Sequence, residues 1–512
     1  MIKKIIFFLL IPVIAFSQEK DKVAMKYAKE IAANSMFKNL SVLASDEYEG
    51  RETGKKGQKM AAAYIAKQFK EMGIPPYKDT SYYQPYPLNM LAPAPLNIEI
   101  EGKKYTRNKD YYNFPLQTEQ KIETQNIIFL GYGIEDSVYN DYEGVNVSDR
   151  VIMIMEGEPF SDDSLSLITQ SKISSKWSFN LNLKIEAAKQ KNVAALLIVK
   201  DDIGKEIEKN KTKLATATLK LTQEKEMPII YISKLMANEI LKYRDTENVQ
   251  RIISETKRPL NVPGKSTVII DIQNNTQPII AENVLGYIEG SDLKEQLIVV
   301  SAHYDHLGKE GNIVFNGADD DGSGTVAIID IAKAFIKAKK EGHGPRRSIL
   351  FIAFSGEEKG LLGSAYYVEN PVFPLKNTVC DLNIDMIGRI DDDHFDDPDY
   401  IYLIGSDKLS FQLHNISEGV NKTYINIKLD YRYNDDKDRN RYYYRSDHYN
   451  FAKNGIPVIF YFNGIHPDYH RETDEIEKIN FDKMQKIARL VYYTAWEVAN
   501  RTDRIVLDSE RK

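Results

Sequence analysis

The sequence predicts an α/β protein with a mostly parallel mixed sheet, covered by helices on both faces, and with a β-rich domain inserted into the chain. Two observations predict this. From residue 283 onward, near-continuous apolar runs alternate with helical stretches, which is typical of strands buried on both faces. Between residues 124 and 263, short β-rich runs are interleaved with Lys- and Glu-rich amphipathic stretches. This change of pattern predicts a separate, inserted domain.

The elements follow from hydrophobic periodicity and from the residues that end each run. Residues 22–73 have apolar side chains at helical spacing, and Gly73, Pro75 and Pro76 end that run. The Pro- and Tyr-rich residues 77–95 suggest irregular structure. Beyond the insert we expect strands at 297–301, 348–354, 382–386 and 458–462, and helices at 325–339, 360–368 and 481–498.

The chain length also indicates more than one domain. With 512 residues, the chain exceeds the ~250–300 residues at which one hydrophobic core stops growing. We divide it into a leader (1–17), the first part of the main domain (18–123), the insert (124–263) and the rest of the main domain (264–512).

The N-terminus has the pattern of an export signal. Lys3 and Lys4 precede an apolar stretch from Ile5 to Phe16, and Ala15 and Ser17 are small residues suited to cleavage before Gln18. The apolar stretch is shorter than the ~20 residues that span a bilayer, and no Cys follows it that could carry a lipid. We therefore expect a periplasmic or secreted protein without stable membrane insertion after signal removal.

Charge and cysteine usage exclude some classes of function. The formal net charge is -6 and the pI is about 5.9, so no basic field indicates nucleic-acid binding. Cys380 is the only cysteine, which rules out an intramolecular disulfide and a Cys-rich metal site. Because Cys380 lies in the apolar stretch 378–384, we expect it to be a buried small hydrophobic residue.

Polar clusters follow the predicted strands of the main domain. Ligands of open α/β sheets collect at the carboxyl ends of strands, and imidazole together with carboxylate suits zinc. A single His or Asp in such a place is more often a loop residue or a helix cap, but clusters in five places are hard to explain in that way. The clusters are Ser301–His306, Asn316–Gly324, Ser355–Gly360, Asn383–Arg389 and His466–Asp474.

These clusters resemble the motifs of the co-catalytic dinuclear zinc peptidase family, which includes bacterial secreted leucyl aminopeptidases, glutamate carboxypeptidase and the non-catalytic transferrin receptor. The resemblance covers residues 283–480 and reaches the N-terminal stretch Leu43–Gly54. The insert resembles a protease-associated domain, chiefly through 151–157 and 187–199. The resemblance implies a zinc-peptidase fold, two zinc ions per chain and peptide substrates.

The resemblance also implies a ligand set. His303 and Asp385 match ligands of one zinc ion, and Glu358 and His470 match ligands of the other. Asp320 matches the carboxylate that bridges both ions, because it stands two residues before Gly-Ser-Gly. All five positions keep the family's residue types, which argues against an inactive relative.

Three further positions match the catalytic residues of the family. Glu357 matches the general base, Tyr469 matches a tyrosine that stabilises the oxyanion, and Asp305 supports His303. The chemistry agrees with this assignment, since two zinc ions ~3.5–4 Å apart can activate a shared water. Glu357 can accept the proton of that water and pass it to the leaving amine. Asp305 is expected to accept a hydrogen bond from the far ring nitrogen of His303.

Other metal or nucleophile sites are weaker interpretations. Residues 319–330 partly fit a calcium loop, but position 12 is Asp330 instead of Glu and no helix clearly precedes the loop. The acidic run 391–399 suits either calcium or solvent. Ser446, Asp447 and His448 suggest a serine triad, but the chain has no Gly-x-Ser-x-Gly motif, and we expect Asp447 and His448 in the pocket wall.

Several functions remain open from the sequence. An exported aminopeptidase is the preferred interpretation, and a carboxypeptidase with the same metal centre is the alternative, because Arg389, Arg445 and Arg471 lie near the motifs. A single-zinc enzyme like glutaminyl cyclase and a non-catalytic binding protein are further alternatives. We also expect the insert to cover the cleft, so that only short peptides can enter. The pattern predicts neither side-chain preference nor oligomeric state.

Overall fold

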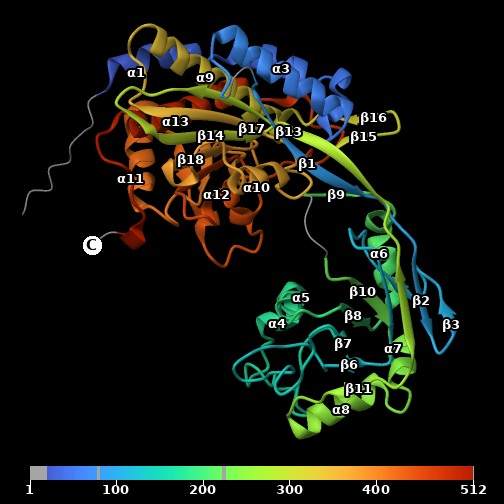
Figure 1. Ribbon diagram of the computed structural model, residues 1–512. Coiled ribbons are helices and arrows are strands. Elements are labelled where there is room, and N and C mark those ends of the chain that lie inside the picture. Colours follow the sequence, from blue (N-terminus) through green and yellow to red (C-terminus); the bar gives the residue numbers. More distant parts are fainter. Residues whose placement is uncertain (1–19, 78–80, 222–225, 511–512) are drawn as a thin grey trace, which may run out of the picture. The chain divides into compact units, whose positions relative to one another are not determined.

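The computed structural model describes residues 20–77, 81–221 and 226–510 (Figure 1). The predicted signal peptide, 1–17, lies outside the described residues. The chain divides into two compact units, one formed by residues 1–86 and 280–512 and the other by residues 87–279. The predicted insert, 124–263, lies within the second unit, which begins earlier and ends later.

The first unit is built on a large mixed sheet. Its strands lie in the order β20-β19-β21-β18-β14-β17-β13-β1, and the far end of β1, inside the second unit, pairs with β9. The four central strands are parallel, whereas β13 and β19 run antiparallel to their neighbours β17 and β21. The bounds are β1 Tyr83–Leu91, β9 Thr218–Leu221, β13 Thr276–Ile288, β14 Leu293–His303, β17 Arg347–Phe354, β18 Thr378–Ile384, β19 Tyr400–Ile404, β20 Lys428–Asp430 and β21 Val458–Phe462.

Helices cover both faces of this sheet (Figure 1). One core cluster joins one face to α1, α2, α3, α9, α11 and α13, and another joins the opposite face to α10 and α12. The predicted fold class is thus confirmed. The bounds are α1 Lys22–Tyr27, α2 Ala33–Leu43, α3 Lys56–Met72, α9 Gly324–Lys340, α10 Leu362–Glu369, α11 Phe411–Val420, α12 His448–Ala452 and α13 Phe481–Asn500.

The central strands match the apolar runs of the sequence because they are buried on both faces. All residues of β17, β18 and β21 are buried, and Cys380 is fully buried in β18 as expected. β18 lies earlier than the predicted 382–386, so that Asp385 stands directly after the strand.

The prediction of irregular structure for residues 77–95 was wrong in part, because β1 occupies 83–91. Gln84, Tyr86 and Leu88 point inward while Pro85 and Pro87 are exposed. Proline lacks a backbone donor, and here it stands at the alternate, outward positions of the strand. The prolines therefore masked a period-2 pattern that was present in the sequence.

The second unit holds two smaller sheets. A six-stranded sheet has the order β11-β6-β7-β8-β10-β4 and a four-stranded sheet the order β3-β2-β12-β5. Helices α4 Lys176–Phe179, α5 Leu181–Gln190, α6 Ile203–Ala215, α7 Lys234–Leu241 and α8 Thr246–Thr256 accompany them. The strands are β2 Leu96–Ile100, β3 Lys103–Tyr105, β4 Tyr111–Tyr112, β5 Gln120–Thr124, β6 Ile127–Phe129, β7 Val151–Met155, β8 Ala195–Lys200, β10 Ile229–Ser233, β11 Val262–Pro263 and β12 Val268–Ile272.

The chain enters and leaves the second unit at neighbouring points. β1 leads into this unit and β13 leads out of it, and the amide of Ala92 donates to the carbonyl of Asn275 over 3.0 Å. Among the described residues, no helix is long and apolar enough to cross a membrane.

Candidate metal centre

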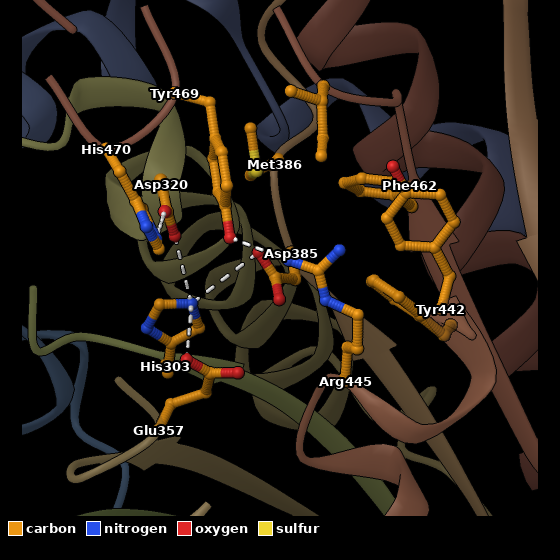
Figure 2. A pocket seen from close by; sticks show the side chains of 12 residues that line it. His303, Asp320, Glu357, Asp385, Met386, Tyr442, Arg445, Phe462, Tyr469 and His470 are labelled. Carbon is orange, nitrogen blue, oxygen red and sulfur yellow. Dashed lines mark hydrogen bonds and ion pairs between the residues drawn. The ribbon is translucent and has the colours of Figure 1, made fainter. Parts of the chain in front are cut away.

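The predicted site residues come together at the carboxyl ends of the central strands. His303 ends β14, Glu357 and Glu358 follow β17, Asp385 follows β18, and His470 lies in the loop after β21. Asp320 lies in the irregular turn Ala318–Ser323 that leads into α9. Figure 2 shows His303, Glu357, Asp385, Asp320 and His470 around one pocket.

His303 is the centre of a first group of donor atoms. Its Nε2 lies 3.3 Å from Asp320 Oδ1, 3.5 Å from Asp385 Oδ1 and 3.9 Å from Glu357 Oε2. Two atoms that each bind one zinc ion at ~2.0–2.2 Å are less than about 4.4 Å apart. All three distances satisfy this limit, and His303, Glu357 and Asp385 form a group that could hold a metal ion.

Glu358 is the centre of a second group. Its Oε2 lies 3.2 Å from His470 Nε2, and its Oε1 lies 2.9 Å from His306 Nδ1. Asp320 Oδ2 lies 3.1 Å from His470 Nε2 and 3.8 Å from His306 Nδ1. His306, Asp320 and Glu358 form the second group with metal-binding geometry. His306 was not predicted to have a role, and its position three residues after His303 is the signal that could have indicated one.

Asp320 joins the two groups. Its Oδ1 faces His303 and its Oδ2 faces His470 and His306, which is the arrangement that a bridging carboxylate requires. Burial alone would raise the pKa of Asp320, but the adjacent imidazoles of His303 and His470 hold it well below its usual value. Its ionised form is therefore strongly favoured.

The pKa of Glu357 is shifted in the opposite direction from that of Asp320. Burial raises its pKa well above the ordinary value, and although His303 opposes this shift, the carboxylates of Glu358 and Asp385 reinforce it. Its amide donates to Asp305 Oδ1 over 3.2 Å. A carboxyl group with a raised pKa beside a metal site is suited to accepting and releasing a proton.

Asp305 supports the site in a way that differs in part from the expectation. The closer acceptor for His303 Nδ1 is the main-chain oxygen of Asp305, at 3.1 Å, and the Asp305 carboxylate lies 3.8 Å away. That carboxylate instead accepts from Thr53 Oγ1 over 2.6 Å and from the Glu357 amide. Thr53 belongs to the N-terminal motif 43–54, so this motif contributes directly to the site.

Asp321 and Asp474 position the ligand segments and were not singled out by sequence reasoning. The Asp321 carboxylate accepts from the amides of His303, Gly324 and Met386. The Asp474 carboxylate accepts from the amides of Asp319 and Asp320. Both aspartates stand inside the polar clusters, but their inward direction depends on the loop backbone, which the sequence pattern does not specify.

The pocket beside the metal-binding groups has one apolar wall and one cation. Its cavity volume is about 30 Å³. Arg445 Nη2 donates to Tyr469 Oη over 3.1 Å, and its guanidinium lies over the Tyr442 ring at 5.0 Å (Figure 2). Burial and the Asp320 carboxylate raise the pKa of Tyr469, so it stays a neutral donor. The apolar wall consists of Met386, Tyr442, Phe460, Phe462 and Ile465.

The structure separates the residues of the suggested serine triad. Ser446 Oγ donates to Asp385 Oδ2 over 2.7 Å, and Asp447 accepts from Ser364. His448 is buried and stacked on Phe460, with ring centroids 4.7 Å apart. The three side chains do not form a relay, because each contacts a different neighbour: Asp385, Ser364 and Phe460. Of the other candidates, Arg389 is paired with Asp468 at 2.8 Å.

The donor set fits a pair of zinc ions. It combines imidazole nitrogens with carboxylate oxygens, which zinc accepts readily. Several buried atoms that face the groups have no hydrogen-bond partner among the described residues: His306 Nδ1 and Nε2, Asp320 Oδ2 and Glu358 Oε1. Buried polar atoms are rarely left without a partner, and a bound cation would satisfy the oxygens and one ring nitrogen.

Comparisons with known proteins lead to the same group of enzymes. Residues 283–495 match Peptidase family M28. A protein of Trichophyton verrucosum described as "Probable leucine aminopeptidase" is 31% identical over 216 residues, which are 41% of this chain and 56% of the relative. Aminopeptidase YwaD of Bacillus subtilis is 26% identical over 245 residues, 43% of this chain and 45% of the relative. The chain thus spans about half the length of these relatives.

A solved structure shows that the fold extends over nearly the whole chain. The aminopeptidase from Aneurinibacillus sp. strain AM-1 is 17% identical with a TM-score of 0.53, and the match covers 94% of this chain and 98% of the other. At this identity the likeness concerns the fold alone. Together with the sequence matches, it shows that the chain resembles the zinc aminopeptidases of peptidase family M28, as its motifs predicted.

Proposed function

We propose that this protein is an exported, zinc-dependent aminopeptidase that removes N-terminal residues from peptides. The observation that carries this proposal is the pair of donor groups that share Asp320, with Glu357 beside them. His303 and Asp385 would hold one zinc ion, Glu358 and His470 the other, and Asp320 both. When bound, two zinc ions polarise the scissile carbonyl and lower the pKa of a water molecule.

The protein's own residues perform the remaining steps. Glu357 accepts the proton of the attacking water at a carboxylate oxygen and delivers it to the amine of the leaving peptide. Tyr469 donates its hydroxyl hydrogen to the oxyanion of the tetrahedral intermediate. Arg445, which donates to the same hydroxyl oxygen, polarises the tyrosine and fixes its direction. The apolar wall with Phe460 and Phe462 receives the side chain of the N-terminal residue.

One observation favours a carboxypeptidase as the second candidate. Arg445 lines the pocket, and within the described chain its guanidinium contacts the Tyr469 hydroxyl and the Tyr442 ring. A guanidinium of this kind can bind the C-terminal carboxylate of a peptide in a bidentate way. Arg389 is unsuited to that role because Asp468 already neutralises it.

The test is hydrolysis of aminoacyl-p-nitroanilides and of N-blocked peptides, with and without a chelator, by the wild-type protein and the Glu357→Gln variant. We expect chelator-sensitive release from free N-termini, reduced about 10²–10⁴-fold in the variant, with zinc content unchanged at about two per chain. Hydrolysis of N-blocked peptides would establish the carboxypeptidase. Hydrolysis of neither set would leave a cyclase or a binding protein as the better account.

A further inference from the structure

His306 is a fully buried imidazole that faces the second donor group. Its Nδ1 lies 2.9 Å from Glu358 Oε1 and 3.8 Å from Asp320 Oδ2. Neither ring nitrogen has a hydrogen-bond partner among the described residues. A buried imidazole whose ring nitrogens make no hydrogen bond is costly in a protein interior, so a bound ligand at Nδ1 would account for its position.

The distances fit a shared metal ion. Atoms bound to one zinc ion at ~2.0–2.2 Å lie less than about 4.4 Å apart, and His306 meets this limit toward both Glu358 and Asp320. His470 Nε2 faces the same two carboxylates, sharing Asp320 Oδ2 with His306 and facing Glu358 Oε2 where His306 faces Oε1. The centroids of the two rings are 6.0 Å apart. Both imidazoles therefore point at one position.

The His306 ring packs directly against the backbone of Gly317. Gly317 has a φ of +52°, and a Cβ added there would lie 2.3 Å from the main-chain oxygen of Asp320 and 2.5 Å from two carbons of the His306 ring. A glycine without a side chain is thus what allows the imidazole to stand against the loop that carries Asp320. On its other side, the His306 amide donates to the carbonyl of Arg51 over 3.4 Å.

Resting on the proposed zinc centre, we propose that His306 is a fourth protein ligand of the second metal position, together with His470, Glu358 and Asp320. Glu357 also lies within ligand distance of the first position, but in the proposed function it acts as the base. That position is then left with His303, Asp385 and Asp320. Four protein ligands are typical of zinc sites that retain their ion, and three with an open place are typical of catalytic sites. The two positions are therefore unequal, and the first is the open, more easily exchanged one.

The experiment is zinc binding by the full chain, measured as metal content after dialysis against buffers of graded free zinc. We expect two steps for the wild-type protein, and we expect His306→Asn to weaken the tighter step at least about tenfold. The visible absorption of the Co²⁺-loaded protein should change in the same variant, because a ring nitrogen is lost from the coordination. Neither readout depends on activity.

His466→Asn is the matched control. His466 is also buried, its ring nitrogens also lack hydrogen-bond partners among the described residues, and its Nε2 faces Asp319 at 3.3 Å instead of the donor groups. It should titrate like the wild-type protein. Equal losses in both variants would overturn the inference, because general packing would then explain them, and so would an unchanged tight step in His306→Asn.

A second variant covers the case that His306→Asn folds poorly. His306→Gln keeps a polar side chain but has no ring nitrogen, so it should weaken the same step. Each variant is also compared with its own metal-free form through the rise in melting temperature that zinc causes. Two zinc steps in the wild-type protein with no effect at His306 would defeat this inference alone. Absence of zinc binding in the wild-type protein would defeat the proposed function as well.

Discussion

At the scale of single residues, Tyr469 has the clearest separable role. Replacing it by Phe removes the hydroxyl that accepts from Arg445 and would donate to the oxyanion. We expect kcat to fall about 10²–10³-fold, with KM and zinc content nearly unchanged. Steady-state kinetics on a leucine p-nitroanilide measure this. Tyr442→Phe, which removes a hydroxyl from the pocket wall, is the control, and equal losses in both variants would contradict the assignment.

The sequence predicted residue types better than residue directions. His303, Asp320, Glu358, Asp385 and His470 could be located because each stands at a strand end or before a helix, where backbone geometry leaves few choices. Whether they bind metal as assigned stays a prediction. His306, Asp321 and Thr53 could not be given roles, because the direction of their side chains depends on loops with positive-φ or irregular backbone such as Gly317.

At the scale of elements, Arg51 connects the N-terminal segment by hydrogen bonds to the loops that carry the donor groups. It is fully buried and donates to the carbonyls of Leu43, Tyr304, Asn316 and Gly317. Arg51→Met would leave these acceptors without partners, and we expect a loss of at least about 3 kcal/mol in unfolding free energy. Denaturant titration measures it.

Arg346→Met is the comparison for this prediction. Arg346 pairs with Asp292 near the surface, and an exposed ion pair contributes less than about 1 kcal/mol. A loss of similar size in both variants would show that the buried contacts of Arg51 carry no special weight.

Helix α13 contains a buried lysine that makes stability depend on pH. Lys483 Nζ lies 3.5 Å from the centroid of the Tyr400 ring and has no hydrogen-bond partner among the described residues. Burial lowers its pKa to about 7, although Asp319 and Asp391 oppose the shift. An unfolded lysine has a pKa of about 10.4. Between these two pKa values, Lys483 is protonated in the unfolded chain but mostly neutral in the folded protein. The unfolded state therefore binds more protons, and the unfolding free energy of the wild-type protein rises with pH.

Lys483→Met removes this dependence. We expect the variant to exceed the wild-type protein in unfolding free energy by up to about 4 kcal/mol at pH 6, and the difference to shrink toward pH 9. Urea titrations at several pH values test this. Lys486→Met, an exposed lysine of the same helix paired with Asp399, should show no such trend. A difference that is constant with pH would contradict the buried-lysine account.

Element boundaries were predicted best where strands are buried on both faces. β21 is a continuous apolar run and coincides with the strand predicted at 458–462, and β17 is apolar from Ile349 to Phe354. β1 was missed because its prolines disguise the alternation, and β20 was not identified because it has only three residues. β19 was also missed, although it is as long as β21. Short runs carry too few residues for a period to be distinguished.

At the scale of the whole molecule, the second unit should be removable. Its ends are hydrogen-bonded to each other through Ala92 and Asn275, so a short Gly-Ser loop can replace residues 93–274. We expect the remaining chain to fold, bind zinc and hydrolyse aminoacyl-p-nitroanilides. If the unit limits access, as the sequence suggested, long peptides should become better substrates relative to short ones.

A peptide series of increasing length measures this selectivity. The same deletion in the Glu357→Gln background shows how much hydrolysis is due to contaminants. Unchanged selectivity would end the hypothesis that the unit restricts substrate length, and failure to bind zinc would show that the first unit depends on the second.

The donor atoms come from five stretches of chain between His303 and His470, each ending or following a different element. No short peptide of this protein contains a complete donor group, so we expect the nascent chain to bind a metal ion only weakly before it folds. The donors meet only when the central strands have aligned, which requires the closure of long loops. If these donors bind zinc as proposed, metal uptake would be a late step of maturation. An exported chain would acquire its zinc after crossing the membrane and folding, from the metal available there.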